Sequence, residues 1–348
     1  MAEIKDYGEL YTADILVVGG SMAGLVTAIR AKENEPDLDI LVVDKGIIGW
    51  NGQATKAGNG IRSTSKHPDG VMNALQYLVH AHTPFMNDQE FLKKYLEVHR
   101  DNIDYMKHCG VITSCNAEGE ATPLPFIPDA LDMGGVSINV CEQLRTYALK
   151  LGIRLLSRVN VFELLTSDKG KVIGAIGFDM DHMDCKIFHA KAVAMATQGC
   201  HFKKIGLEFM GYGTGVGAMY RVGALMRNVE FSTQTDVVFK KTNTPIYGGF
   251  NMICNKNGEN LTKKYIGHLE WEVTPALVDA MVKEVAEGNG PLWVNLEEPD
   301  EVRMMIGGTD MDETTQRMFR DKIDWEHHVF MKTARDIGEV GTKPETTI

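Results

Sequence analysis

The sequence lacks paired cysteines, long apolar runs and an excess of positive charge. Each absence argues against one class of protein: one with a metal or iron–sulfur cluster, one that spans a membrane, or one that binds nucleic acid. Its six cysteines are scattered over 348 residues, and none forms the C-x-x-C pair typical of iron–sulfur and zinc sites. No run of about eighteen apolar residues is present, so no membrane-spanning helix is expected. The net charge of −11 argues against a nucleic-acid partner, because phosphate contacts need clustered lysine and arginine.

The remaining composition is ordinary for a globular protein that is long enough for two domains. Hydrophobic residues make up 44% of the chain and charged residues 24%. Residues 1–6 are polar and acidic, unlike a secretory signal. Scattered cysteines are typical of free buried thiols in a reducing compartment, so we expect a cytoplasmic protein. The histidines at positions 80, 82, 99 and 108 have no metal-binding spacing, and no metal site is expected.

What the sequence does contain is a glycine turn between two apolar runs. Residues 14–18 are followed by Gly19-Gly20-Ser21-Met22-Ala23-Gly24 and then by a helical pattern, and residues 40–43 lead into Asp44. Strand, turn, helix, strand and a terminal acid form the dinucleotide-binding pattern. In it the helix N-terminus faces the pyrophosphate, and the acid meets a ribose hydroxyl. The alternative is a buried strand–helix–strand unit that binds no ligand.

One residue departs from this pattern. Ser21 occupies the position of the second glycine in G-x-G-x-x-G, where a side chain crowds the closest approach of the phosphate. A serine hydroxyl can still donate to a phosphate oxygen. We therefore retain the prediction of a dinucleotide site.

The rest of the chain predicts further α/β elements. Residues 45–61 form a glycine-rich loop suited to wrapping a flat ligand, although a mobile surface loop is the alternative. Helical patterns cover residues 69–110 and 140–149, residues 111–137 read as irregular, and short strands follow, including a strand pair over residues 186–195. Two small-residue turns come next, at residues 196–199 and 211–217, and the second opens a helix over residues 218–226. A domain boundary is expected near residue 235, before a turn at residues 255–260, a helix at 275–287 and a strand at 292–296.

Taken together, these motifs resemble the flavoprotein subunits of the succinate dehydrogenase/fumarate reductase superfamily. The likeness rests on the turn at residues 18–24, Asp44-Lys45, the small-residue loop, Ala196-Thr197-Gln198-Gly199 and Gly213-Thr214-Gly215. Residues 255–259 and 273–296 resemble its capping domain, and residues 162–165, 174–178, 190–193 and 288–291 are similar to the alpha subunit of adenylylsulfate reductase. The resemblance implies a Rossmann-like FAD-binding domain over residues 1–235, with a central parallel sheet and a small antiparallel sheet. It also implies an inserted α+β capping domain over residues 236–330, and a return segment, shorter than in the family, over residues 331–348.

The resemblance also implies which residues meet the cofactor, and that this is FAD rather than NAD. The expected FAD-binding residues lie at the pyrophosphate, at the ribose, along the ribitol and ring system, at the adenine side and in the second turn. They are Gly19, Gly20, Ser21, Ala23, Gly24, Asp44, Lys45, Gly52, Gln53, Ala54, Gly58, Asn59, Gly60, Asn160, Thr197, Gln198, Gly199 and Thr214. Relatives that link FAD covalently use a histidine in the loop over residues 50–60. That loop has no histidine, and Gln53 stands near the matching place, so non-covalent FAD is expected.

Three departures from the family pattern argue against fumarate or succinate as the substrate. The His-Pro-Thr motif is replaced by residues 230–236, which lack histidine, Ala276 stands where an arginine follows the proline, and residues 245–249 replace Arg-Gly-Glu-Gly-Gly. We expect an FAD-dependent oxidoreductase subunit that passes electrons between a small molecule and an iron–sulfur partner. The expected second subunit is either this iron–sulfur protein or a chain that completes the flavin site. Its catalytic residues are unknown, with His201 the first candidate to mutate. A non-catalytic FAD-binding scaffold subunit is the alternative, and an NAD-binding dehydrogenase domain is a third.

Overall fold

A computed structural model describes most of the first 200 residues and shorter segments beyond them. The described residues are 7–55, 60–82, 85–116, 119–124, 127, 129–199, 212–227, 238–239, 251, 253–267, 275–294 and 340–341. The chain divides into two compact units. The first unit comprises residues 1–58, 107–112 and 137–229, and the second comprises residues 59–106, 113–136 and 230–348.

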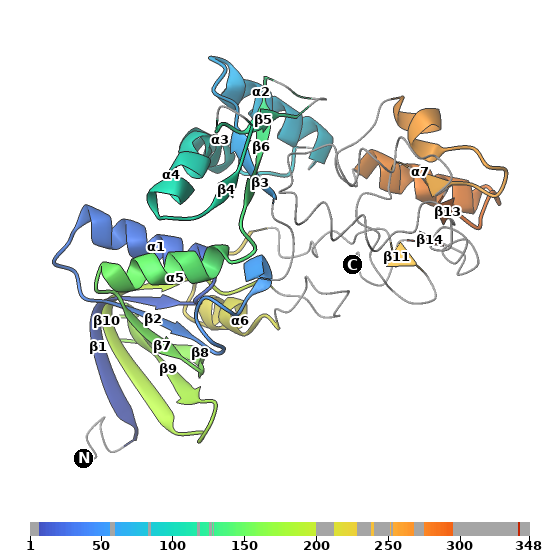
Figure 1. The fold of residues 1–348 in the computed structure, drawn as a ribbon. Helices are drawn as coiled ribbons and strands as arrows, with labels where there is room; N and C mark the ends of the chain where they lie inside the picture. Colours follow the sequence, from blue (N-terminus) through green and yellow to red (C-terminus); the bar gives the residue numbers. More distant parts are fainter. Residues whose placement is uncertain are drawn as a thin grey trace, which may run out of the picture. The chain divides into compact units, whose positions relative to one another are not determined.

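The first unit is built on a sheet in the order β7-β2-β1-β10-β9-β8 (Figure 1). Its strands are β1 (Glu9–Val18), β2 (Ile40–Asp44), β7 (Arg154–Ser157), β8 (Val159–Thr166), β9 (Val172–Asp179) and β10 (Cys185–Met195). Pairings among β7, β2, β1 and β10 are parallel, whereas β9 pairs antiparallel with both β10 and β8. The α/β fold, with a parallel-dominated sheet and a small antiparallel sheet, is therefore confirmed.

Register brings three predicted motifs to one edge of this sheet. Val18 at the end of β1 lies opposite Val43 of β2 and Met195 of β10. The carboxyl ends of parallel neighbours meet at the same edge, which is where open α/β sheets bind ligands. The glycine turn, Asp44 and the turn after β10 therefore leave the sheet side by side.

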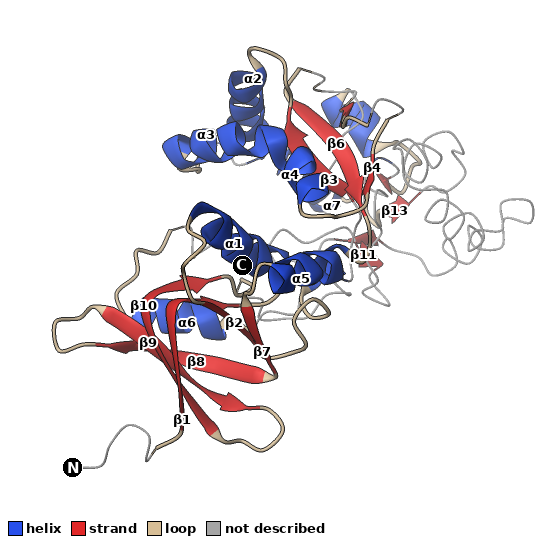
Figure 2. Cartoon of the chain, turned by 60° about the vertical axis from the view of Figure 1, so that its left-hand side comes forward, coloured by secondary structure: helices blue, strands red, loops and turns tan. Residues whose placement is uncertain are grey.

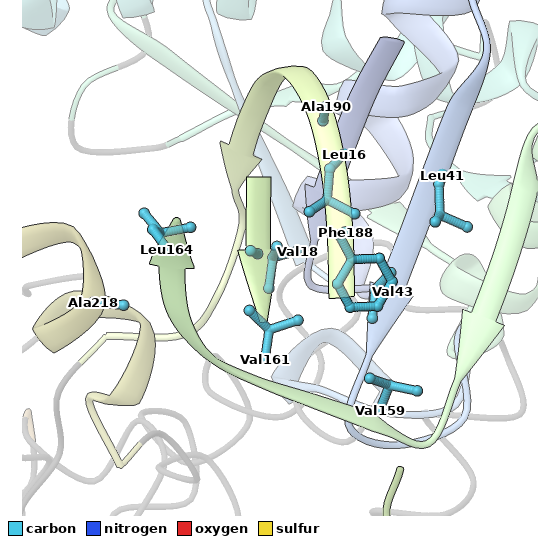
Figure 3. Close-up of a cluster of buried hydrophobic side chains, with 11 residues drawn as sticks. Leu16, Val18, Leu41, Val43, Val159, Val161, Leu164, Phe188, Ala190 and Ala218 are labelled. Carbon is cyan, nitrogen blue, oxygen red and sulfur yellow. The ribbon is translucent and has the colours of Figure 1, made fainter. Parts of the chain in front are cut away.

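Helices cover the sheet because their apolar residues recur on one side. Helix α1 (Met22–Asn34) buries Gly24, Leu25, Ala28 and Ile29, and it lies beside α5 (Val140–Lys150) (Figure 2). Helix α6 (Thr214–Arg221) contributes Ala218 to a core of alternate strand residues, where side chains of period two share a face. Figure 3 shows this core, with Phe188 among Leu16, Val43 and Val161.

Three sequence-based expectations need correction. Residues 186–195 are not a strand pair, because β10 is one strand that pairs parallel with β1 on one side and antiparallel with β9 on the other. The helix after the second glycine turn begins at Thr214 and ends at Arg221, earlier than expected at both ends. Residues 111–137 are not irregular, because they contain β4 (Thr113–Ser114), β5 (Thr122–Pro123) and β6 (Leu131–Val136).

The second unit begins with an antiparallel sheet covered by helices. Strand β3 (Gly60–Thr64) pairs with β6, which also pairs with β4 and β5. Helices α2 (Gly70–Tyr77) and α3 (Gln89–Val98) pack on a core that includes Ala74, Leu96 and Leu131, and α4 (Asn102–His108) follows. Asp88 caps the N-terminus of α3, because its side chain accepts from the backbone N–H of Phe91.

The later part of the second unit contains the turn and helix that the sequence predicts. Asn255 Oδ1 accepts from the backbone N–H groups of Asn257 and Glu259, which confirms the turn. Helix α7 (Pro275–Ala286) follows, and β12 (Ile253–Cys254) pairs with β13 (Trp293–Val294). Strands β11 (Val238–Phe239) and β14 (Val340–Gly341) also pair. Within the described ranges, no helix is both long enough and apolar enough to span a membrane.

Candidate functional site

The glycine turn after β1 is held against the turn after β10 by close backbone packing. Gly19 has φ of +116°, and a Cβ atom there would lie 2.4 Å from the carbonyl oxygen of Ala196. A Cβ at Gly24 would lie 1.7 Å from the carbonyl oxygen of Gly19. Glycine is therefore required at both positions for α1 to start this close to the end of the strand.

The Ser21 side chain lies beside the turn, close to Gly52 and Cys141. Its Oγ lies 3.8 Å from Cys141 Sγ, and a Cβ built on Gly52 would come within 2.5 Å of the same Oγ. The serine side chain makes no capping bond to α1, although Ser21 is the N-cap residue. Burial raises the pKa of the Cys141 thiol, which keeps it neutral beside the turn. The crowding expected from Ser21 is thus directed toward Gly52 and Cys141.

Asp44 fastens the turn to the loop that follows β2. Its buried carboxylate accepts from the backbone N–H of Gly20 at 2.7 Å, from that of Gly46 at 2.7 Å, and from Asn51 Nδ2 at 2.6 Å. An ionised carboxylate offers about four acceptor positions, so one more donor can still bind. Asp44 is thus placed both to order the loop and to receive a hydroxyl.

The turn after β10 carries a buried hydroxyl that makes no hydrogen bond within the described residues. Thr197 Oγ1 is this atom, and it packs against the backbone of Gly215 in the first turn of α6, where a Cβ would lie 2.1 Å away. Its neighbour Gln198 donates from Nε2 to Gln53 Oε1 at 3.0 Å. The glycine-rich loop is therefore tied to this second turn.

Comparison with known proteins decides what kind of ligand this edge is built for. The sequence model of the FAD binding domain family matches residues 14–332. The chain belongs to this family. FAD is accordingly the cofactor, and the predicted membership of the succinate dehydrogenase/fumarate reductase flavoprotein superfamily is confirmed.

Curated relatives and solved structures agree with the family. The chain is 23% identical over 303 residues to the 8-methylmenaquinol:fumarate reductase flavoprotein subunit of Wolinella succinogenes, covering 80% of this chain and 47% of that one. It is 25% identical over 259 residues to the fumarate reductase flavoprotein subunit of Mycobacterium tuberculosis, covering 68% and 40%. The chain thus spans about half the length of the curated relatives it matches.

Two solved structures share the fold. A variant of the E. coli quinol fumarate reductase superposes with a TM-score of 0.73 at 18% identity, covering 86% of this chain and 56% of that one. Adenylylsulfate reductase from Archaeoglobus fulgidus superposes with a TM-score of 0.70 at 18% identity, covering 95% and 56%. At this identity the likeness establishes the fold.

The residues of the edge fit FAD. Two glycines that admit no Cβ would let backbone approach a pyrophosphate closely, and a helix N-terminus with an uncapped first turn favours an anion. Thr197 Oγ1 is a buried polar atom in need of a partner at the same edge. These residues would hold the dinucleotide, and the bound flavin would supply the electron transfer.

The other residues expected to bind FAD are found at several different places in the fold. Lys45 is exposed directly after Asp44, Ala54 lies in the short helical turn Gln53–Thr55, and Thr214 is the first residue of α6. Asn160 is partly buried in β8, opposite Phe178. Gly60 opens β3 in the second unit. Gly58, Asn59 and the catalytic candidate His201 lie outside the described residues. Their roles toward FAD stay predictions.

Two residues of the site were missed by the sequence analysis. Asn51 bonds to Asp44, and Cys141 touches Ser21 across 120 positions of the chain. The small polar character of the loop was the available signal for Asn51, whereas nothing near Cys141 indicates its contact. Arg221, in α6, forms an ion pair with Glu163 at 2.6 Å and joins α6 to β8.

Substituting Thr197 by valine is expected to weaken FAD binding about fivefold while leaving the protein at least as stable, because it removes a buried hydroxyl that has no hydrogen-bond partner among the described residues. The measurement is FAD titration by flavin fluorescence, with thermal unfolding recorded alongside. Thr64→Val is the matched control, since Thr64 Oγ1 is also buried and makes no hydrogen bond within the part of the chain that the structure describes, but it belongs to the second unit. It should keep wild-type FAD affinity. Wild-type affinity in Thr197→Val would contradict the assignment.

Proposed function

We propose that this chain is the FAD-bearing part of an oxidoreductase that passes electrons between a small-molecule substrate and an iron–sulfur partner protein. The observation that carries the proposal is the edge formed by Gly19, Gly24, Asp44 and Thr197, which suits a non-covalently held dinucleotide. The loop residue Gln53, placed against Gln198, cannot form the histidyl link of covalent relatives. FAD is expected to leave the protein on denaturation.

We place the iron–sulfur cluster on a partner. Within the described residues no group of three or more His, Cys, Asp or Glu side chains could hold a metal ion, and the five described cysteines form no disulfide. A reduced flavin that gives up its electrons one at a time needs another redox group to receive them, and an iron–sulfur cluster on a partner protein would supply that group. Described cysteines without disulfides also support a reducing cytoplasmic location.

We further propose that the substrate is not fumarate or succinate. Ala276 follows Pro275 in the first turn of α7, where the dicarboxylate enzymes are expected to carry an arginine. A methyl group cannot bind a carboxylate or deliver a proton, and two carboxylates need cationic partners. The other two departures, at residues 230–236 and 245–249, lie outside the described residues.

A test reduces the FAD-loaded protein under anaerobic conditions and follows the flavin absorbance band. Addition of fumarate should leave the flavin reduced, and addition of an oxidised soluble iron–sulfur protein should reoxidise it. Reoxidation by fumarate would contradict the exclusion of dicarboxylates. A flavin that a chemical reductant bleaches but no iron–sulfur protein reoxidises would favour the alternative, a non-catalytic FAD-binding subunit.

A further inference from the structure

An exposed tyrosine lies beneath the side chain of Lys45, the residue that follows the acid expected to bind the ribose. Lys45 comes directly after Asp44, and its Nζ lies 5.3 Å from the centroid of the Tyr212 ring. Tyr212 is 82% exposed, and it precedes Gly213 and the first turn of α6. Nothing in the motif pattern of the sequence points to this ring.

The ring is placed at the adenosine end of the site. Asp44 marks the ribose, and the start of α6 marks the second turn, because Thr197 packs against Gly215 there. Tyr212 joins these two places through its contact with Lys45 and its position beside Gly213. The family resemblance groups Lys45 with the loop of Gln53, along the ribitol and flavin ring, but its contact with Tyr212 directs the Lys45 side chain toward the start of α6. A planar group next to the ribose of FAD is the adenine base.

The contact with Lys45 alone explains little of why the ring is held there. A cation–π pair at an exposed site contributes about 0.5–1 kcal/mol, which only offsets the ordering of two side chains. A tyrosine face stacks favourably on any nucleobase, whereas its hydroxyl remains in water. Lys45 then approaches the same ring and limits where it can lie.

We propose that Tyr212 is an FAD-binding residue whose ring stacks on the adenine, with Lys45 positioning that ring. The inference rests on the FAD site described above and adds the residue that selects the adenine moiety. A ligand with adenosine gains this contact, whereas a flavin without adenosine does not. FAD should therefore be retained over FMN and riboflavin partly through Tyr212.

The test is titration of the full chain, stripped of flavin, with FAD, ADP and riboflavin. Tyr212→Ala should weaken FAD and ADP about tenfold, as expected for the loss of one base stack, and should leave riboflavin binding unchanged. Tyr212→Phe keeps the ring and should bind all three like the wild type. Tyr220→Ala is the matched control, because Tyr220 is also exposed, at 69%, and lies within α6.

The outcomes separate this inference from the cofactor site itself. Wild-type binding of FAD and ADP by Tyr212→Ala would overturn the stacking role and leave the FAD site intact. Equal losses for riboflavin and ADP would overturn it as well, because the ring would then act on the fold rather than on adenine. A wild-type chain that binds neither FAD nor ADP would overturn the site and this inference together.

Discussion

Replacing Gly24 with alanine should reduce FAD affinity at least a hundredfold and destabilise the first unit by about 3 kcal/mol, as overpacking does when neither side can yield. The added Cβ would lie 1.7 Å from the carbonyl oxygen of Gly19, which is backbone and is fixed by the N–H of Gly19 bonding to Val43. Helix α1 would have to shift away from the turn. Its free N–H groups would then no longer face the pyrophosphate.

A second helical glycine provides the control for Gly24→Ala. Gly217 lies in α6, and a Cβ there would meet only the flexible end of Arg221, at 3.2 Å. Gly217→Ala should bind FAD normally and gain about 0.5–1 kcal/mol from helix propensity. Urea unfolding and FAD titration of both variants make the comparison. A Gly24→Ala protein with wild-type stability and FAD affinity would show that α1 does not start against this turn.

Replacing Glu284 with alanine is expected to cost about 3 kcal/mol in the free energy of unfolding, as for other buried pairs that lose one partner. Glu284 is fully buried in α7, and its carboxylate accepts from Lys264 Nζ at 2.8 Å, Tyr265 Oη at 2.6 Å and Asn255 Nδ2 at 2.8 Å. Lys264 can regain water because it is partly exposed, but Asn255, at 1% exposure, cannot. Chemical unfolding followed by circular dichroism measures the loss.

The same network predicts how stability depends on pH. The hydrogen bond from Lys264, aided by Tyr265 and Asn255, lowers the pKa of Glu284 from 4.5 to about 2. The unfolded chain therefore binds a proton that the folded chain does not as the pH falls below 4.5. The contribution of ionised Glu284 to the free energy of unfolding is complete above pH 4.5, and it is lost as the pH falls from 4.5 to 2. The stability difference between the wild type and Glu284→Gln should narrow over that interval.

Glu259 offers a matched control for Glu284. It bonds to the same Lys264 and Asn255, but its side chain is 50% exposed. Glu259→Ala should therefore cost about 1 kcal/mol or less, in keeping with a surface pair. Both variants should retain ADP binding, because the residues proposed for the adenosine end, Asp44, Lys45 and Tyr212, belong to the first unit. Equal losses in Glu259→Ala and Glu284→Ala would contradict the role assigned to burial.

The sequence predicts those parts of the site that are local along the chain. The turn from Val18 to Gly24, Asp44 after β2 and the turn after β10 each follow an apolar run, so their place at a sheet edge can be predicted from pattern. Pairing partners cannot be predicted in this way. The strand β6 lies within a proline-containing segment and pairs with β3, about seventy residues earlier, so its local pattern suggested irregular chain.

The remaining features of the site depend on contacts between residues that are far apart in the sequence. Cys141 meets Ser21 only because α5 lies beside α1, and Tyr212 meets Lys45 only because α6 packs against the sheet. Neither contact has a period or motif that a single sequence displays. The continuity of β10 likewise depends on having a partner on each side, which the alternation of its residues does not reveal.

Non-covalent binding of FAD by this chain is tested most directly by the visible spectrum of the purified protein before and after acid precipitation. We expect an oxidised flavin spectrum in the native protein, and FAD in the supernatant after precipitation at about one per chain. Gly24→Ala, purified in parallel, should be colourless. Flavin that stays with the precipitate would contradict non-covalent binding. A wild-type chain that remains colourless after incubation with FAD would contradict the site itself.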